Sequence, residues 1–509
     1  MSEEHHESTE EVNSFPTVDG RDLEYEITFA IVFNWFIGLP IIALVFIISS
    51  IYISNNYLKD KFIDEIFHVS MVEQYFKGDF KTWDSKITTP PGLYYLGYVW
   101  AKLIQLLHIP INPVGLNSLR LINAIGGAVV LPISLNSLFI LNPIGFWQTN
   151  IVLFPILSTF YYFFYTDVWS TVFIISSLST AIGLPFGDKL SIKVSAILGF
   201  LSIWFRQTNI IWNLLVLVFV IERRATIQKN FTDSFLNNCI KFIIQFFEDF
   251  WEFSLPYIIN FVLFFGFLIY NRGITLGDKE NHVAGFHLIQ FFYCISFITF
   301  FTWPVWISTQ FIKDYLRRFR LGFILVVLEI LGIWIIIRFF TVIHPFLLAD
   351  NRHYTFYIFR KIINYSFFRK YIIMGQIYHF STYVFFRTLN SNAFEFNSIN
   401  ELPFKLTRDL PLKPTGISIW TLTICIILTV VPSPLFEPRY YIVPFIIYRL
   451  FISVPFESYY QGQNLKNVTL VRLFCELLWL ILINIVVILM FTFYTFSWDT
   501  ESNPQRIIW

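Results

Sequence analysis

Charged residues and cysteines are scarce in this chain of 509 residues. Asp, Glu, Lys and Arg together make up 14% of it, whereas a soluble globular protein contains about 25%. The formal net charge of +1 gives no sign of a nucleic-acid partner. The 4 cysteines show neither metal-ligand spacing nor a disulfide framework. We therefore expect no nucleic-acid partner, and any part of the fold outside a membrane must be held by packing.

Apolar residues dominate instead. Hydrophobic residues make up 55% of the chain and aromatic residues 20%, and the mean hydropathy is +0.59. A run of about 20 apolar residues spans a bilayer, and such runs recur throughout, so an all-α polytopic membrane protein with about 13 spans is predicted. The first run is longer than the apolar core of about 7–15 residues in a signal peptide, so we expect it to be retained. The expected spans are 27–53, 121–141, 147–165, 168–186, 190–205, 207–221, 252–270, 286–308, 321–340, 371–388, 416–435, 441–456 and 472–496.

The basic residues of short loops predict the orientation of these spans. Loops beginning at Arg223 and Lys313 are rich in Lys and Arg, which favours the cytosolic side. Counting spans from these loops places a tail, 1–26, in the cytosol. The membrane domain would occupy 27–496, with non-cytosolic loops at 54–120, 271–285 and 341–370 and a C-terminal tail at 497–509. The part from 91 to 108 is apolar enough either to cross the membrane or to lie as an amphipathic helix in the interface.

Three ionisable residues follow the first span in the motif IDEIFH, namely Asp64, Glu65 and His68. On a helix, Asp64 and His68 are four residues apart and share a face. A carboxylate beside apolar residues, just outside the hydrocarbon, can act as a general base. Acidic residues also favour helix starts because they stabilise the helix dipole. The motif therefore indicates either a catalytic base or a solvated helix start.

Further polar motifs fall, by the same count of spans, on the same non-cytosolic face. Asp167 and Arg206 lie at one membrane level, where a buried charge usually faces a partner or a cavity, so Arg206 could bind Asp167 or a phosphate. The donors near residue 350 could bind a phosphate or sugar, or only lipid headgroups. The His-x4-His spacing near residue 282 lacks further ligands, so we expect no metal. The candidate binding residues are His68, Thr89, Asp167, Arg206, Asp278, Lys279, His282, His344, Asp350, Arg352, His353 and Arg439.

Taken together, these motifs predict a polar, aromatic-lined cavity at one face of the membrane, with carboxylates on one segment and Arg and His on others. Such a cavity suits a sugar attached to a lipid phosphate. A polytopic transporter or channel-associated protein is the alternative from another class. Transporters often contain internal repeats and broken helices at the midplane. No repeat is visible in this chain, and the gathering of polar motifs at one face favours an enzyme.

Six motifs resemble one enzyme family, the dolichyl-phosphoglucose-dependent α-1,2-glucosyltransferases of the endoplasmic reticulum. They occur in the family's order between Asp64 and Pro444, and the runs TTPPGLY and HPFLLADNRHY are the most specific. The resemblance implies a GT-C type fold with about 13–14 transmembrane helices and a lumenal loop region carrying short amphipathic helices. It implies an endoplasmic reticulum membrane protein whose active site faces the lumen. A dolichyl-phosphomannose-dependent mannosyltransferase is the alternative within the same class.

The resemblance also implies the chemistry. Dolichyl phosphate glucose is the expected donor, and a diglucosylated dolichyl-diphosphate oligosaccharide the acceptor, with inversion to a terminal α-1,2 linkage. The family's early acidic motif falls on Asp64, the expected general base, with Glu65 as the alternative. Arg352, His353, Arg439 or Lys279 could stabilise the departing phosphate. We expect no cofactor and no essential metal, and membrane lipid as a further partner.

Overall fold

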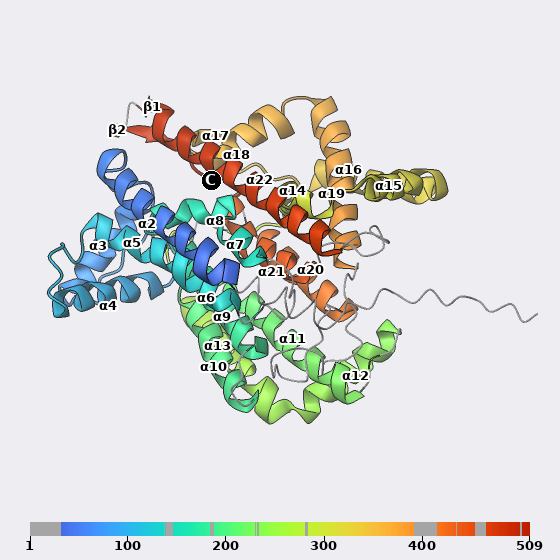
Figure 1. Cartoon of the computed structure of the whole chain (residues 1–509), viewed down its shortest axis with the longest axis horizontal. Helices are drawn as coiled ribbons and strands as arrows, with labels where there is room; N and C mark the ends of the chain where they lie inside the picture. The colour runs from blue at the N-terminus through green and yellow to red at the C-terminus, as the bar shows by residue number, and fades with distance from the viewer. Residues whose placement is uncertain are drawn as a thin grey trace, which may run out of the picture.

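The computed structural model describes residues 32–136, 138, 146–183, 188–229, 231, 234–279, 283–390, 415–433, 435–452, 465–498 and 501–509. Most expected spans are helical where the apolar runs predicted them (Figure 1). The corresponding helices are η1 (Phe33–Gly38) with α2 (Leu39–Asn56), α5 (Leu116–Ile125) with η2 (Gly126–Val130) and α6 (Leu131–Asn136), α9 (Asp167–Gly183), α10 (Asp188–Ile203), α11 (Asn209–Lys229), η5 (Phe250–Ser254) with α13 (Leu255–Asn271), α14 (Ile289–Trp306), α16 (Phe323–Phe339), α19 (Met374–Leu389), α20 (Gly416–Val430), α21 (Ile442–Phe451) and α22 (Leu465–Phe493).

The expected span 147–165 is not one helix. It consists of α7 (Trp147–Val152), α8 (Pro155–Thr159) and the short η4 (Phe160–Tyr162). The break falls at Phe154, whose ψ of 115° is far from helical. Phe154 precedes Pro155, and the proline ring disfavours the helical conformation of the residue before it. Hydropathy alone could not reveal this break because the residues on either side of it, 152–157, are all apolar.

Shorter helices occupy the polar intervals. They are α3 (Glu65–Phe76), α4 (Gly92–Leu106), α12 (Phe235–Glu248), α15 (Thr309–Leu321), α17 (Pro345–Ala349), α18 (Tyr354–Tyr357), η6 (Ile358–Ile363), η7 (Phe368–Ile373) and η9 (Pro438–Tyr441). The strands β1 (Thr495–Trp498) and β2 (Glu501–Arg506) follow α22 as an antiparallel hairpin. Helix α4 packs against α3, and it still exposes Val99 and Leu106. This arrangement favours the interfacial interpretation of 91–108.

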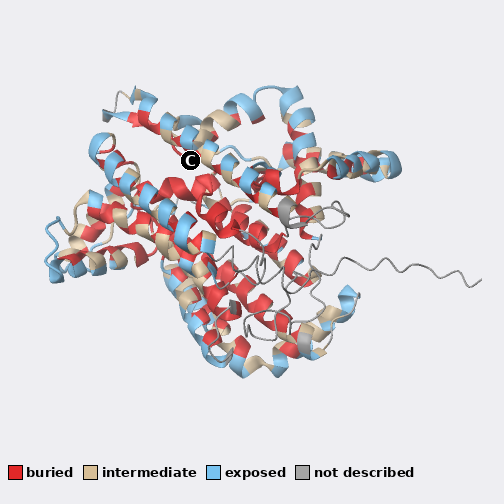
Figure 2. Ribbon diagram, viewed as in Figure 1, coloured by how far each residue is buried: buried red, intermediate tan, exposed pale blue. Residues whose placement is uncertain are grey.

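The chain is a multi-pass, all-α membrane protein. Within the described residues, five helices are long and apolar enough to cross a membrane, or six if α15 and α16, bent by 99°, form one span. Helices α9 and α20 are apolar but shorter, and the expected number of 13–14 spans stays a prediction. Buried residues gather along the inward faces of the helices (Figure 2). Outward faces remain apolar, as at Leu44, Ile324 and Leu482, which are 60%, 74% and 53% exposed. Such surfaces suit contact with lipid.

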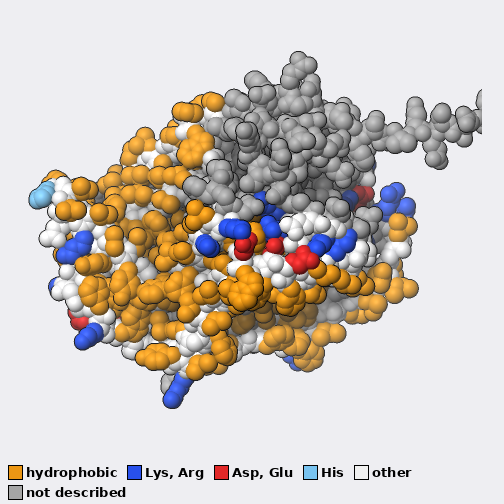
Figure 3. Space-filling model, turned by 90° about the horizontal axis from the view of Figure 1, so that it is seen from below, with side chains coloured by type: hydrophobic (Ala, Val, Ile, Leu, Met, Phe, Trp, Pro, Cys, Tyr) orange, Lys and Arg blue, Asp and Glu red, His pale blue; other side chains and the backbone are white. Residues whose placement is uncertain are grey.

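One face of the molecule shows how polar groups interrupt this apolar exterior. Among the side chains drawn in colour, hydrophobic ones cover most of this face, and Lys, Arg, Asp and Glu side chains gather near its centre (Figure 3). In the interior, ion pairs are buried, as at Arg449 and Glu476, whose side chains are 0% and 1% exposed. Buried charges persist only where they are paired and hydrogen-bonded.

A second buried ion pair holds the turn that leads from α2 into α3. Arg120 of α5 binds Glu65 through Nε (2.9 Å to Oε1) and Nη2 (2.6 Å to Oε2). Both side chains are 0% exposed. Arg120 also donates to the carbonyl oxygens of Leu58 and Asp60, at 2.5 and 2.9 Å. The pair therefore ties α5 to the start of α3 and to the turn between them.

We expect Arg120→Leu to destabilise the protein strongly, because it leaves the Glu65 carboxylate buried and unpaired. Breaking a buried pair costs about 3–5 kcal/mol of the free energy of unfolding. The matched control is Lys61→Ala, which removes a partly exposed pair with Glu73 (3.1 Å) and should cost about 0–1 kcal/mol. Thermal unfolding of the purified variants in detergent measures both. Equal melting temperatures for the two variants would contradict this role of the pair.

Candidate active site

Asp64 is the most accessible carboxylate of the IDEIFH motif. It occupies the N-cap position of α3, but its side chain makes no capping hydrogen bond within the described residues. The backbone N–H of Asp64 donates to the hydroxyl of Tyr165 at 3.1 Å. The preceding residue, Ile63, has a φ of +50°, which is a strained conformation for a β-branched side chain. The turn therefore presents a carboxylate that is 37% exposed and not used to cap its own helix.

A chain of ion pairs links Asp64 to η9. Arg439 Nη1 lies 3.3 Å from Asp64 Oδ2, and Arg439 Nε lies 2.6 Å from Glu437 Oε2. Burial raises the pKa of Asp64, but Arg439, followed by His68 and His353, outweighs burial, and the net pKa is below its ordinary value. Burial likewise raises the pKa of Glu437, yet Arg439 holds it below the usual range. Both carboxylates are therefore ionised at neutral pH, with Arg439 between them.

His68 lies behind Asp64 on α3. Its Nδ1 is 2.9 Å from the Tyr94 hydroxyl, and the residue is buried. Burial lowers the pKa of His68 to about 4, although Asp64 opposes this shift. The imidazole is therefore neutral at pH 7 and can donate or accept a hydrogen bond without adding a charge to the site.

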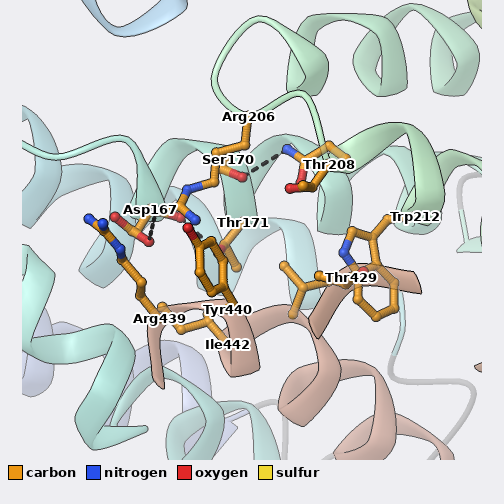
Figure 4. Close-up of a pocket in the computed structure, with 12 residues that line it drawn as sticks. Asp167, Ser170, Thr171, Arg206, Thr208, Trp212, Thr429, Arg439, Tyr440 and Ile442 are labelled. Carbon is orange, nitrogen blue, oxygen red and sulfur yellow. Dashed lines mark hydrogen bonds and ion pairs between the residues drawn. The ribbon is translucent and has the colours of Figure 1, made fainter. Parts of the chain in front are cut away.

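Arg206 forms an ion pair with Asp167. This carboxylate was one of the two partners expected for the arginine, the other being a phosphate. Arg206 Nη2 lies 2.7 Å from Asp167 Oδ1. Asp167 Oδ2 is buried and has no hydrogen-bond partner in the part of the chain that the structure describes. The guanidinium of Arg206 also lies 5.2 Å from the ring centre of Tyr440. Arg439 approaches the same carboxylate from the other side (Figure 4), close enough that Asp167 stabilises its charged form.

These residues line a cavity with an empty volume of about 300 Å³, including the space open to solvent. One end contains the two arginines, and the other end is formed by uncharged side chains of α11, α20 and α21. The cavity can therefore hold an anion beside a less polar group. Its lining consists of Asp167, Ser170, Thr171, Arg206, Thr208, Asn209, Trp212, Thr429, Arg439, Tyr440, Ile442 and Val443.

Glu65, the alternative base, lies in a different environment. Besides the bidentate pair with Arg120, its carboxylate accepts hydrogen bonds from the backbone N–H of Phe62 at 3.0 Å and of Phe164 at 2.8 Å. Its side chain is 0% exposed. The geometry therefore favours Asp64, and the assignment of the base stays a prediction.

The remaining candidates are partly gathered here. Thr89 follows Thr88, whose carbonyl accepts from Gln207 at 2.7 Å, so the TTPPGLY turn packs beside Arg206. The backbone N–H of Asp278 donates to Ser85 at 2.9 Å, which brings the 271–279 loop onto the same turn. Lys279 is exposed and donates to the Asn271 carbonyl at 2.6 Å.

Other candidates lie near residue 350. His344 caps α17 by accepting from the Phe346 N–H at 3.2 Å, and no contact with Asp64 is described for it. Arg352 is paired with Asp350 at 2.7 Å. His353 lies near enough to Asp64 and Glu437 to lower the pKa of both. His282 lies outside the described residues.

Two members of the site were missing from the candidate residues. Glu437 binds Arg439, and its position two residues earlier in EPRYY was the available signal. Tyr165 contacts Asp64 and has no distinctive signal beyond its closeness to Asp167. Among the described residues, His, Cys, Asp and Glu nowhere gather in a group of three or more that could hold a metal. The expectation of a metal-independent reaction stays a prediction.

The structure combines apolar helices with one site that contains a partly exposed carboxylate, two arginines and a cavity. This combination is typical of polytopic membrane enzymes with a polar active site. Residues 58–450 match the model of the DIE2/ALG10 family. The chain belongs to this family, and it is a glycosyltransferase. No solved structure matches it.

The relatives carry one common name, "Dol-P-Glc:Glc(2)Man(9)GlcNAc(2)-PP-Dol alpha-1,2-glucosyltransferase". The Kluyveromyces lactis relative is 45% identical, with 98% of this chain and 93% of the relative aligned. The Candida glabrata relative is 46% identical over 96% of this chain and 95% of its own length. A human relative is 28% identical over 91% and 97%. These matches confirm the resemblance seen in the motifs and give no support to a transporter or a mannosyltransferase.

Proposed function

We propose that the protein transfers glucose from dolichyl phosphate glucose to the diglucosylated dolichyl-diphosphate oligosaccharide, forming the terminal α-1,2 linkage. The names of relatives that are 45% and 46% identical support this donor and acceptor. The observation that carries the proposal is the uncapped, 37% exposed carboxylate of Asp64, 3.3 Å from Arg439. A proton acceptor beside a cation is what transfer from a sugar phosphate to a hydroxyl requires.

In the reaction, Asp64 accepts the proton of the acceptor hydroxyl while that oxygen bonds to the anomeric carbon of glucose. The bond between this carbon and the phosphate oxygen breaks, and dolichyl phosphate leaves with the electron pair. Attack on the face opposite the leaving group inverts a β-linked donor to an α-linked product. A positioned general base contributes about 10²–10⁴ in rate.

The departing phosphate needs positive charge, and the structure favours Arg439 and Arg206 for this role. Arg439 and Arg206 line the cavity, whereas Arg352 and Lys279 are absent from its lining and are bonded locally to Asp350 and Asn271. A phosphate that binds Arg439 would compete with Asp64 for the same guanidinium. The pKa of Asp64 would then rise, and its carboxylate would become a better base when the donor is present. A phosphomonoester held by arginines needs no metal clamp, so no essential metal is proposed.

The proposed location is the endoplasmic reticulum membrane, with the tail 1–26 in the cytosol and the site facing the lumen. The count of basic loops supports this orientation. The structure supports it further, because the 271–279 loop is hydrogen-bonded to the 54–120 segment and Arg439 of η9 is paired with Asp64. Membrane lipid would cover the apolar helix faces, and the dolichyl chains would enter from it.

Asp64→Asn should lower glucose transfer at least about 10²-fold, because it removes the basic lone pair with little change of shape. Glu65→Gln should lower the yield of folded protein more than the turnover per folded molecule, because its carboxylate binds Arg120 in the interior. The measurement is transfer from dolichyl phosphate glucose to the diglucosylated acceptor by both purified variants.

The amount of folded protein, measured by gel filtration in detergent, normalises each rate. The same assay with EDTA should retain wild-type turnover. Near wild-type turnover by Asp64→Asn would move the base elsewhere, and complete loss with EDTA would refute the metal-independent mechanism.

The acid limb of the pH profile should report Asp64. A general base works deprotonated, so kcat/KM should fall as the pH drops through its pKa, which lies below the ordinary value of 3.8. Arg439→Gln removes the largest influence that lowers this pKa, so burial prevails and the limb should move to higher pH. Arg318→Gln, on α15 and paired with Glu329, should leave the limb in place. If the acid limb of Arg439→Gln stays in place, Asp64 is not the group that titrates in it. Enzyme returned from low pH to pH 7 must regain its activity, so that the limb reports titration and not unfolding.

Phe80→Asn should create a glycosylated site, because it places an acceptor Asn-Lys-Thr in the interval predicted to face the lumen, at a side chain that is 42% exposed. The native sequence Asn230-Phe-Thr lies in a loop predicted to be cytosolic and should stay unmodified. An endoglycosidase-sensitive mobility shift measures the first, and mass spectrometry the second. Glycan at Asn230 together with none at residue 80 would invert the topology.

A further inference from the structure

Residues 495–509 lie beyond the 58–450 family match, yet they pack against the candidate site. The β1–β2 hairpin follows α22, and the residues after it reach α18 (Figure 1). Ile507 and Ile508 are 3% and 2% exposed. The ring centre of Trp509 lies 4.7 Å from that of Tyr354. The segment is therefore built into the interior rather than lying free on the surface.

Ile508 holds the backbone on both sides of His353. Its N–H donates to the carbonyl of Arg352 at 2.8 Å, and its own carbonyl accepts from the N–H of Tyr354 at 2.9 Å. These bonds form a parallel β-bridge between His353 and Ile508. A residue whose two neighbours are both bonded in this way has little freedom to turn.

Trp498 of β1 holds the two residues before His353. The guanidinium carbon of Arg352 lies 4.3 Å from its ring centre, and its indole N–H donates to Asn351 Oδ1 at 2.8 Å. Arg352 also donates to Gln505 Oε1 of β2 at 3.4 Å. The arginine is thus engaged by Asp350, Trp498 and Gln505, which fits a structural role better than contact with substrate.

The segment that carries His353 cannot hold itself. Helices α17 and α18 on either side contain 5 and 4 residues, far fewer than the about 12–15 residues that an isolated helix needs. His353 nevertheless lies close enough to Asp64 and Glu437 to act on both electrostatically. Contacts from outside the segment must therefore hold it in place, and Trp498, Gln505 and Ile508 supply them.

We infer that residues 495–498 and 501–509, through Trp498, Gln505 and Ile508, are a positioning element of the active site, which fixes the backbone on both sides of His353. The effect of this element on the rate of glucose transfer rests on the proposed function, whereas its effect on the structure of residues 351–354 does not. The Nε2 of His353 lies 3.8 Å from Asp350 Oδ2, and a displaced backbone would move this imidazole relative to the carboxylates of the site. Misplacement of such a group by about 1 Å can cost about 10²-fold in rate.

Ile508→Pro and Ile508→Ala form a matched pair. Proline removes the N–H that donates to Arg352 and fixes φ, whereas alanine keeps both backbone bonds. Ile508→Pro should lower kcat/KM for glucose transfer about tenfold or more, and Ile508→Ala should lose much less. The double variant Ile508→Pro with His353→Ala should be no worse than His353→Ala alone, because both changes remove the same positioned group. Additive losses would overturn the inference.

Trp498→Ala, Trp498→Phe and Phe496→Ala test the hairpin if the proline variant does not fold. Phe496 lies on the same strand, with its ring 6.4 Å from that of Tyr494, and its loss should leave activity unchanged. Trp498→Ala should lower activity, and Trp498→Phe, which keeps a ring over Arg352, should recover part of it.

Hydrogen exchange of peptides covering 351–356 supplies a readout that needs no activity. Exchange should accelerate in Ile508→Pro and Trp498→Ala but not in Ile508→Ala or Phe496→Ala. Unchanged exchange in the first two variants would overturn the inference even if activity fell. A wild-type enzyme without glucose transfer would instead refute the proposed function, and the exchange experiment would still decide the role of residues 495–509.

Discussion

The buried ion pair between Glu65 and Arg120 is the constraint on which the site depends. Taking two charges out of water costs several kcal/mol each, and only a bidentate pair with further hydrogen bonds offsets that cost. Glu65 meets this condition with Arg120 and two backbone N–H groups. Because the side chain of Glu65 points into the interior, the side chain of its neighbour Asp64, at the N-terminal end of α3, points outward. One structural carboxylate thereby positions one that is free for chemistry.

Much of the fold was predictable because hydropathy encodes where a helix can lie in lipid. The long runs near residues 39–56, 255–271 and 468–493 are spans by length and composition alone. The exception at 147–165 shows the limit of this reasoning, since a single proline breaks the run at a point where the adjoining residues are all apolar. The β1–β2 hairpin could not be predicted, because its strands show no hydrophobic periodicity. Its stability comes from contacts with a segment about 150 residues earlier, as between Trp498 and Asn351.

The sequence predicted which motifs contribute to the candidate site, but not which of their side chains pair with one another. Counting spans placed Asp64 and Arg439 on one face, and the structure brings them to 3.3 Å across 375 residues of sequence. The residue types alone could not choose between Asp64 and Glu65, and only the family resemblance pointed to Asp64. Their difference in environment arises from Arg120, a distant residue on another helix. Arg206 had two possible partners, and the structure pairs it with Asp167. Lys279 and His344 lay in promising motifs, yet their described bonds are local, to Asn271 and to Phe346.

Arg439 reconciles a carboxylate of lowered pKa with the work of a general base. A weakly basic carboxylate is a poor proton acceptor, and Arg439 lowers the basicity of Asp64. The same guanidinium is shared with Glu437 and faces the cavity beside Asp167. The donor phosphate, a diester with one negative charge that gains a second as the bond to glucose breaks, would compete with Asp64 for this guanidinium. Glu437, bonded at 2.6 Å, would keep Arg439 from leaving the site altogether. Donor binding would then both neutralise the leaving group and strengthen the base, so the two halves of the transfer would become competent together.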